Sequence, residues 1–190
     1  MGLLHIIIDV SGSMNEMGKI HLQRNLCRYA TQLQIIDQEK HLGSDIHFYQ
    51  WAQNISEVVL QNDGDILALN SEGSSSLCAL SYFLATHLND TNRSMVLILS
   101  DGNFNHNDYK AFEKWKDEQP ILIRTVAVGA DADLLKLKRI STNNTVYLSE
   151  NISSAINSTI FGSDEPLTAP VSIAHILQSE QAEPEEDWDV

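Results

Sequence analysis

The sequence predicts an α/β protein with a doubly wound, mostly parallel six-stranded sheet and one antiparallel edge strand. Short apolar runs of strand length alternate along its 190 residues with segments whose apolar residues recur every three or four positions, as in amphipathic helices. The runs 3–8 and 95–100 are mostly apolar, which is typical of parallel strands buried on both faces. Segments 46–52 and 55–60 are separated by two residues, a spacing that fits a hairpin at the sheet edge.

The first half of the chain carries three further expected elements. The strand at 3–8 runs directly into Asp9, and its His5 is expected to be a satisfied core residue. A helix is expected from Lys19 to about Asp37, because the apolar residues there recur at spacings of three and four. A second helix is expected from Leu77 to Leu88, where leucines follow one side.

The second half repeats the alternation of strand and helix. Its expected elements are a strand at 95–100, a helix at 108–117, a strand at 121–128, a helix at 134–140, a strand at 145–148 and a helix at 152–161. Asp131 is expected to cap the helix at 134–140, because Asp is favourable just before a helix. Strands joined through helices pair in parallel, and such sheets bind ligands at their carboxyl edge.

Oxygen-bearing side chains follow the first strand in the segment Asp9-Val10-Ser11-Gly12-Ser13-Met14. A strand that ends at a carboxylate and bends through a glycine-containing loop can turn Asp9, Ser11 and Ser13 toward one point. Such oxygen ligands suit hard divalent cations, and Mg²⁺ takes about six of them, some from water. The spacing Asp-x-Ser-x-Ser resembles the metal-ion-dependent adhesion site (MIDAS) of von Willebrand factor A (vWA) domains.

Two later segments resemble the remaining parts of that motif. The segment Gly73-Ser74-Ser75-Ser76-Leu77-Cys78-Ala79-Leu80 is similar to the family's Gly-Gly-Thr-x-x-x-Ala-Leu and places Ser75 at the threonine position. Because the second glycine is missing, Ser74 and Ser76 stay open as alternatives. The strand at 95–100 followed by Asp101-Gly102 resembles the third part. The resemblance covers about residues 3–162, and the metal ligands that it implies are Asp9, Ser11, Ser13, Ser75 and Asp101.

The resemblance implies recognition of a protein, with no catalysis. Two carboxylates and three neutral hydroxyls leave a bound Mg²⁺ or Mn²⁺ undercompensated, particularly if one carboxylate reaches it only through water. In the family an Asp or Glu of a partner protein completes the coordination of the ion. The chain looks like the small bacterial TerY-like group, which implies a link to tellurite resistance or stress response, or to a protein kinase and a PP2C-type phosphatase. Other intracellular vWA proteins are adaptors for MoxR-type AAA+ ATPases, and this alternative stays open.

Three further interpretations stay open. Asp9 and Asp101 could cap their loops without a metal, or the domain could be a structural subunit with a vestigial motif. A metal-dependent hydrolase is favoured least. Gly12 to Ile20 departs from a phosphate-binding loop in its glycine spacing, and Ser11 stands where a haloacid-dehalogenase-type phosphatase needs a second Asp. The chain has no nucleophile elbow and no His-Glu-x-x-His, so we expect no enzyme.

Composition argues against several kinds of partner. The net charge is −14, and residues 163–190 hold eight Asp or Glu and no Lys or Arg, which leaves 18 acidic against 12 basic side chains elsewhere. No nucleic acid is expected as a partner, because phosphate binding needs clustered Lys and Arg. No apolar run approaches the roughly 18–20 residues of a membrane span, and the N-terminal residues lack a signal-peptide pattern, so a cytoplasmic protein is expected. Cys27 and Cys78 are expected to be buried thiols in helices.

The pattern divides the chain into a vWA domain at 1–162 and an acidic C-terminal tail at 163–190. Within the tail we expect a linker at 163–170, a short apolar docking element at 171–178 and a solvated acidic end at 179–190. A tail carboxylate near Trp188 is a candidate for the open position on the metal.

Overall fold

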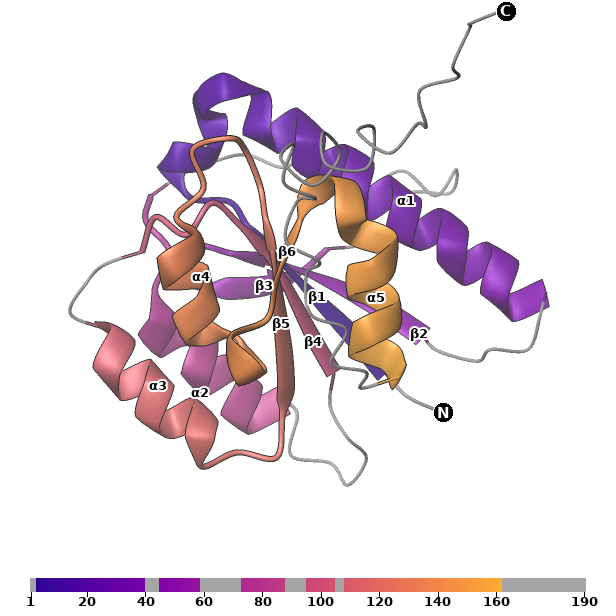
Figure 1. Ribbon diagram of the computed structural model, residues 1–190. Coiled ribbons are helices and arrows are strands. Elements are labelled where there is room, and N and C mark those ends of the chain that lie inside the picture. The colour runs from indigo at the N-terminus through magenta and orange to yellow at the C-terminus, as the bar shows by residue number, and fades with distance from the viewer. Residues whose placement is uncertain (1–2, 40–44, 59–72, 88–94, 105–107, 162–190) are drawn as a thin grey trace, which may run out of the picture.

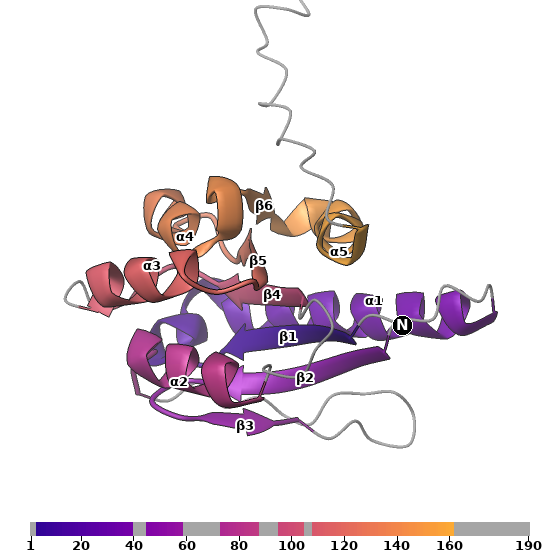
Figure 2. The same ribbon diagram turned by 90° about the horizontal axis from the view of Figure 1, so that it is seen from below.

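The structure is a computed structural model that describes residues 3–39, 45–58, 73–87, 95–104 and 108–161. These residues form a six-stranded sheet in the order β3-β2-β1-β4-β5-β6. The strands are β1 (Leu3–Asp9), β2 (Asp45–Trp51), β3 (Ile55–Glu57), β4 (Met95–Ser100), β5 (Leu122–Ala127) and β6 (Val146–Leu148). Figure 2 shows them side by side, from β3 at one edge to β6 at the other.

Parallel pairing dominates the sheet. β1 pairs in parallel with β2 and β4, β4 with β5, and β5 with β6, whereas β2 and β3 are antiparallel. The hairpin pairs Trp51 with Ile55 and Tyr49 with Glu57, which makes β3 a short edge strand. The predicted fold class, a mostly parallel six-stranded sheet with one antiparallel edge strand, is confirmed.

Helices cover both faces of the sheet. They are α1 (Lys19–Glu39), α2 (Leu77–His87), α3 (Tyr109–Asp117), α4 (Leu134–Ile140) and α5 (Ile152–Phe161), and a 3₁₀ segment, η1 (Gly12–Gly18), precedes α1. Figure 1 shows α1 and α5 on one face and α2, α3 and α4 on the other. The ends of these five helices lie within two residues of the predicted ends, which is the usual uncertainty. In the described ranges, no helix combines the length and apolar character needed to cross a membrane.

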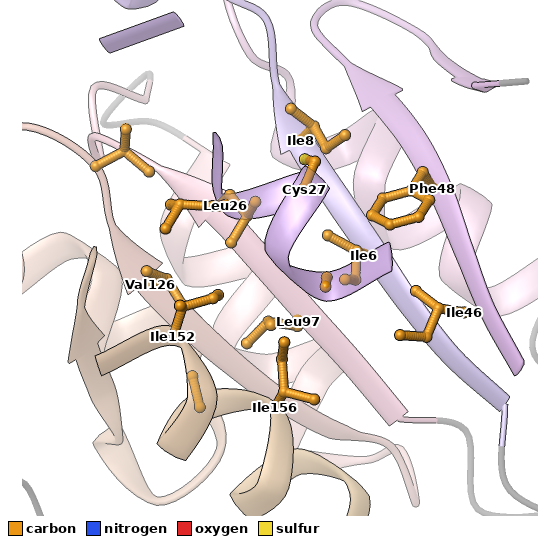
Figure 3. Packing of buried hydrophobic residues seen from close by; sticks show 14 of the residues in the cluster. Ile6, Ile8, Leu26, Cys27, Ile46, Phe48, Leu97, Val126, Ile152 and Ile156 are labelled. Carbon is orange, nitrogen blue, oxygen red and sulfur yellow. The ribbon is translucent and has the colours of Figure 1, made fainter. Parts of the chain in front are cut away.

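The central strands are buried on both faces, which explains their apolar sequences. Ile6 of β1 packs in a hydrophobic cluster with α1 and α5, whereas Ile7 packs in a second cluster with α2, α3 and α4. In β4, Leu97 and Ile98 are divided between the two clusters in the same way. Figure 3 shows the first cluster, whose residues include Ile6, Ile8, Leu26, Cys27, Leu97, Val126, Ile152 and Ile156.

The strand order changes direction between β1 and β4. After β1 the chain adds β2 and β3 on one side, and then returns to place β4 on the other side of β1. Such a switch point leaves a crevice at the carboxyl ends of two neighbouring strands, where α/β sheets bind ligands. Asp9 ends β1 and Ser100 ends β4, so the topology brings the first and third parts of the predicted motif together.

The predicted cap of α4 is wrong by two residues. Asp133, not Asp131, is the N-cap, and its side chain accepts a hydrogen bond from the Lys136 amide at 3.1 Å. Asp131 instead pairs with Lys19 of α1. The N-cap is the residue directly before the first helical residue, and for a helix that begins at Leu134 that residue is Asp133.

The predictions for the cysteines and for the tail have different outcomes. Cys27 is buried as expected, but Cys78 is exposed, because Leu77 and Leu80 occupy the buried side of α2. His5 is buried, and its Nδ1 lies 3.3 Å from the Tyr49 hydroxyl, as a satisfied core histidine should be. The predicted tail at 163–190 lies outside the described residues.

Candidate metal centre

Asp9 lies at the centre of the candidate site and has no exposed surface. Its Oδ1 accepts hydrogen bonds from the Ser11 amide at 2.9 Å and the Ser75 hydroxyl at 2.6 Å. Its Oδ2 accepts a hydrogen bond from the Ser100 hydroxyl at 2.5 Å. Burial raises the pKa of Asp9, and the hydrogen bonds from the three serines oppose that rise. Neutral donors thus orient the carboxylate without neutralising its charge.

The loop after Asp9 brings two serine side chains together. Ser11 Oγ and Ser13 Oγ lie 3.1 Å apart, within hydrogen-bonding distance. The buried Met14 anchors this turn, and its amide donates to the Ser11 carbonyl at 3.0 Å. The Gly12 amide donates to the Gly73 carbonyl at 2.7 Å and ties η1 to the serine loop. A Cβ at position 12 would meet that carbonyl at 3.3 Å, which favours glycine there.

The serine loop presents one of its three hydroxyls to Asp9. Ser75 is buried and donates to the carboxylate, whereas Ser74 is exposed. Ser76 caps α2, because its Oγ accepts a hydrogen bond from the Ala79 amide at 3.2 Å. Among the three serines that the sequence leaves open, the geometry favours Ser75.

Ser100 is a member of the site that sequence reasoning missed. It donates to Asp9, and its Oγ also accepts a hydrogen bond from the Gly102 amide at 3.0 Å. The chain then turns sharply at Gly102, whose φ is +78° and whose Cβ, if present, would lie 2.8 Å from the Asp133 carbonyl. The sequence signal for Ser100 is its place at a strand end, directly before a predicted ligand.

Asp101 is the second carboxylate of the site, and it is 3% exposed. Its Oδ1 accepts a hydrogen bond from the Asn103 amide at 2.9 Å. Its Oδ2 accepts one from the Lys19 ammonium, also at 2.9 Å. Both oxygens of Asp101 therefore already have donors within the protein.

Lys19 is a buried cation at this site that sequence reasoning also missed. Its side chain is 2% exposed, and its Nζ lies 2.9 Å from Asp101 Oδ2 and 2.7 Å from Asp131 Oδ2. Burial alone would lower the pKa of Lys19, but the hydrogen bonds and charges of Asp131 and Asp101 outweigh burial and raise it. The hydrogen bond from Lys19 lowers the pKa of Asp131. Because these partners are 82 and 112 positions from Lys19, no local pattern signals the contacts.

A polar cavity of about 270 Å³ opens beside Lys19 and Asp101. Ser13 also lines it, so the first and third parts of the motif face one space. The full lining comprises Ser13, Glu16, Lys19, Asp101, Asn103, Asp131, Asp133 and Lys136. The cavity gives an ion or a charged side chain of a partner a route to the site.

The side chains at this sheet edge fit a hard divalent cation. Among the described residues, His, Cys, Asp and Glu side chains form no group of three that could hold a metal, so the serine hydroxyls are essential to any site here. Hydroxyl and carboxylate oxygens suit Mg²⁺ or Mn²⁺ and leave positions for water or another ligand. The five predicted residues lie at one edge of the sheet, and Lys19 is the feature that the motif does not predict.

Comparison with known proteins identifies the fold. No protein-family model and no curated protein sequence match the chain. A von Willebrand factor type A structure from Catenulispora acidiphila is 13% identical over 84% of this chain and 42% of that chain, with a TM-score of 0.58. BatB from Bacteroides thetaiotaomicron is 11% identical over 86% of this chain and 100% of that chain, with a TM-score of 0.58.

A third structure comes from an animal. Proximal thread matrix protein 1 (PTMP1) from the mussel byssus, in a structure with a zinc-occupied MIDAS motif, is 12% identical over 84% of this chain and 44% of that chain, with a TM-score of 0.59. The chain spans less than half the length of PTMP1 and of the Catenulispora protein. These likenesses show that the chain has the fold of a vWA domain.

Proposed function

We propose that this chain is a protein-binding module that holds Mg²⁺ or Mn²⁺ at a MIDAS-like site and recognises an acidic residue of a partner protein through that ion. The observation that carries the proposal is the convergence of three chain segments on the buried Asp9: the Ser11 amide, the Ser75 hydroxyl and the Ser100 hydroxyl all donate to its carboxylate. In this proposal the ion is held, directly or through water, by Asp9, Ser11, Ser13, Ser75 and Asp101.

Uncompensated positive charge on the ion would favour an anionic ligand from outside the chain. The serine hydroxyls are neutral, and Lys19 already offsets the charge of Asp101. A divalent cation bound while Lys19 stays paired with Asp101, with Asp101 reached through water, therefore keeps positive charge that Asp9 alone does not balance. The carboxylate of a partner Asp or Glu would supply both a ligand and a compensating charge, as hard cations prefer.

The fold comparison supports a metal at this edge of the sheet, since PTMP1 has a zinc-occupied MIDAS motif. The zinc ion is a feature of the PTMP1 structure. In this chain the donors are hydroxyl and carboxylate oxygens, whereas zinc prefers nitrogen and sulfur ligands in most protein sites, so we propose Mg²⁺ or Mn²⁺.

We propose that the module performs no catalysis and acts in the bacterial cytoplasm. The resemblance to the small TerY-like group motivates partners from stress or tellurite-resistance systems, with a protein kinase and a PP2C-type phosphatase as the first candidates. A MoxR-type AAA+ ATPase is the alternative partner. Each of these proteins would be recognised by an exposed Asp or Glu.

Affinity capture from the source organism tests the proposal. The immobilised full chain is compared in Mg²⁺ and in EDTA, together with Asp9→Asn in Mg²⁺. Asp117→Asn is the matched control, because this acid is 74% exposed on α3. We expect mass spectrometry to find a partner with the wild type and the control in Mg²⁺, and to lose it in EDTA and with Asp9→Asn. A partner captured in all four arms would place the interface elsewhere and contradict the metal bridge.

A second assay addresses the absence of catalysis. The purified chain is incubated with Mn²⁺ and a panel of phosphoesters, and Asp101→Ala serves as the comparison. We expect no turnover above the level of the variant. Turnover that Asp101→Ala abolishes would identify a metal-dependent hydrolase and overturn the proposal.

A further inference from the structure

Lys19 supplies a cation to Asp101, one of the predicted metal ligands. It is the first residue of α1, and its ammonium lies between carboxylates of two different loops, Asp101 after β4 and Asp131 after β5. The two contacts differ in their surroundings, because Asp101 is 3% exposed and Asp131 is 41% exposed. One partner is therefore part of the buried site, and the other faces the cavity and water.

The hydrogen bonds of Asp101 define what an arriving ion must displace. Its Oδ1 is engaged by the Asn103 amide, a backbone donor fixed by the turn. Its Oδ2 is engaged by Lys19, a side-chain donor. An ion that takes Asp101 as a direct ligand can thus gain an oxygen most readily by separating Lys19 from Oδ2. Asp131 can keep the ammonium paired while this happens.

We propose that Lys19 is an affinity-determining residue of the metal site: it competes with the divalent cation for Asp101 Oδ2, and Asp131 retains its ammonium when the cation enters. This inference rests on the metal site of the proposed function. It makes the resting protein a lysine-closed form of the site, in which the Lys19 ammonium, and not an ion, offsets the charge of Asp101. The metal affinity is then set by the difference between the free energies with which the metal ion and the Lys19 ammonium bind Asp101 Oδ2.

The backbone around Lys19 is shaped to admit its side chain. Gly129 has φ +96°, and a Cβ there would lie 2.9 Å from Lys19 Cε, 3.1 Å from Lys19 Cγ and 2.9 Å from Asp131 Oδ1. A glycine two residues after β5 therefore makes room for both members of the Lys19–Asp131 pair. The backbone at Gly129 thus packs closely against the Lys19 side chain and Asp131 Oδ1.

The test measures Mn²⁺ affinity of the full chain by isothermal titration calorimetry, at one pH and ionic strength. Lys19→Met removes the ammonium and keeps an unbranched side chain as far as Cε. We expect the Lys19→Met protein to bind Mn²⁺ at least about tenfold more tightly than the wild type does. That factor is the scale of one charge-assisted hydrogen bond. Lys19→Gln, which keeps a polar end without the charge, is measured as well and should change the affinity in the same direction even if Lys19→Met folds poorly.

Lys136→Met is the matched control for loss of charge. Lys136 lines the same cavity, but it pairs with Asp133 at 3.5 Å. If Lys19 acts by direct competition, Lys136→Met should change the Mn²⁺ affinity by less than about threefold, since a partly exposed charge is screened. An equal gain in both methionine variants would show a general charge effect and overturn the proposal.

A double-mutant comparison tests the role of Asp131. We expect Asp131→Asn to weaken Mn²⁺ binding in the wild type, because Lys19 then has only Asp101 to pair with. In the Lys19→Met protein, the fold-change in Mn²⁺ affinity caused by Asp131→Asn should be less than a third of the fold-change in the wild type. Equal effects in the two backgrounds would refute the retaining role.

The outcomes separate this inference from the proposed function. If the wild type binds Mn²⁺ and both Lys19 variants bind it equally well, the metal site stands and competition by Lys19 is refuted. If only the Lys19 variants bind Mn²⁺, competition is supported and the wild type is not a metal protein by itself. If none of the three binds Mn²⁺ while circular dichroism shows a folded chain, both proposals are overturned.

Discussion

Replacing Asp9 with Asn should separate the stability of the protein from its response to metal. Asn has the shape of Asp, and its Oδ1 can still accept hydrogen bonds from the Ser11 amide and the Ser75 hydroxyl. Its Nδ2 would face Ser100 Oγ, which can accept a hydrogen bond once its own hydroxyl turns away from residue 9. The substitution therefore keeps the hydrogen bonds around position 9 and removes the charge.

The pKa of Asp9 gives the sign of the effect on the metal-free protein. Burial raises this pKa in the folded state, so the contribution of Asp9 to stability is largest below the pKa of the unfolded chain and is lost as the pH rises through the folded pKa. At pH 7.5, above the pKa of the unfolded chain, the raised pKa of Asp9 therefore costs stability, and Asn carries no such penalty. In EDTA, we expect the free energy of unfolding of Asp9→Asn to equal or exceed that of the wild type.

Mn²⁺ should reverse this order, so that the wild type is more stable than Asp9→Asn. An ion present at a hundred times its dissociation constant stabilises a folded protein by about 2.7 kcal/mol. For a chain of 190 residues, each kcal/mol shifts the melting temperature by roughly 2–4 °C. Wild-type protein should therefore gain about 5–11 °C under these conditions, and Asp9→Asn should gain less than about 1 °C.

Differential scanning calorimetry at pH 7.5 provides the measurement. Wild type, Asp9→Asn and the exposed control Asp117→Asn are each scanned in EDTA and in a Mn²⁺ series. The control should follow the wild type throughout, because its side chain is 74% exposed and lies on α3. An Asp9→Asn protein that is strongly destabilised in EDTA, or that still gains stability from Mn²⁺, would mean that Asp9 is a loop cap and not a metal ligand.

Three further substitutions test other parts of the structure. Burial, together with the charges of His47 and His87, lowers the pKa of His5 from 6.5 to about 4, so stability present above pH 6.5 is lost as the pH falls toward 4. Between pH 7.5 and 5 the free energy of unfolding should fall, and urea titrations should show that His5→Gln removes about 2 kcal/mol of that fall. His21→Gln, at an exposed position, should leave the fall unchanged. Gly129→Ala should lower the free energy of unfolding by at least about 2 kcal/mol, because a positive φ is unfavourable for Ala and the new Cβ would displace Lys19. Gly73→Ala, also at positive φ but with no atom closer than 3.8 Å to the new Cβ, should show a smaller loss, and equal losses would contradict the steric argument. Ser75→Ala should weaken Mn²⁺ binding in calorimetric titrations by about tenfold, while Ser74→Ala should leave it within about twofold, and the opposite order would assign the wrong serine.

The fold could be predicted from the sequence because its signals are local. Leu97 and Ile98 are adjacent, and a strand that buries both must be covered on both faces. Asp9 stands at the end of such a strand, and parallel strands joined through helices place their carboxyl ends at one edge. Those two facts place the ends of β1 and β4 at one edge of the sheet, and the observed strand order makes these two strands neighbours.

The rest of the site depends on contacts between residues that are far apart in the sequence. Nothing near Lys19 indicates that its side chain is buried against Asp101 and Asp131, because a lysine at the start of a helix is ordinarily exposed. Asp131, which the sequence predicts as the cap of α4, lies three positions before that helix and pairs with Lys19 instead. Ser100 was also missed, because its hydroxyl contacts Asp9, a partner 91 positions away.

The candidate site is preorganised by its own hydrogen bonds, and this bears on how it would respond to an ion. Both oxygens of Asp9 and both oxygens of Asp101 accept hydrogen bonds from protein donors, so the side chains that would bind a metal are already in place. An entering ion therefore needs little rearrangement, but it must compete with those donors. A partner carboxylate that binds the ion favours the metal-bound form, and by linkage the ion raises affinity for the partner by the same factor. Competition from Lys19 would therefore keep the site closed at low ion concentration and make its opening depend on the partner as well as on the metal.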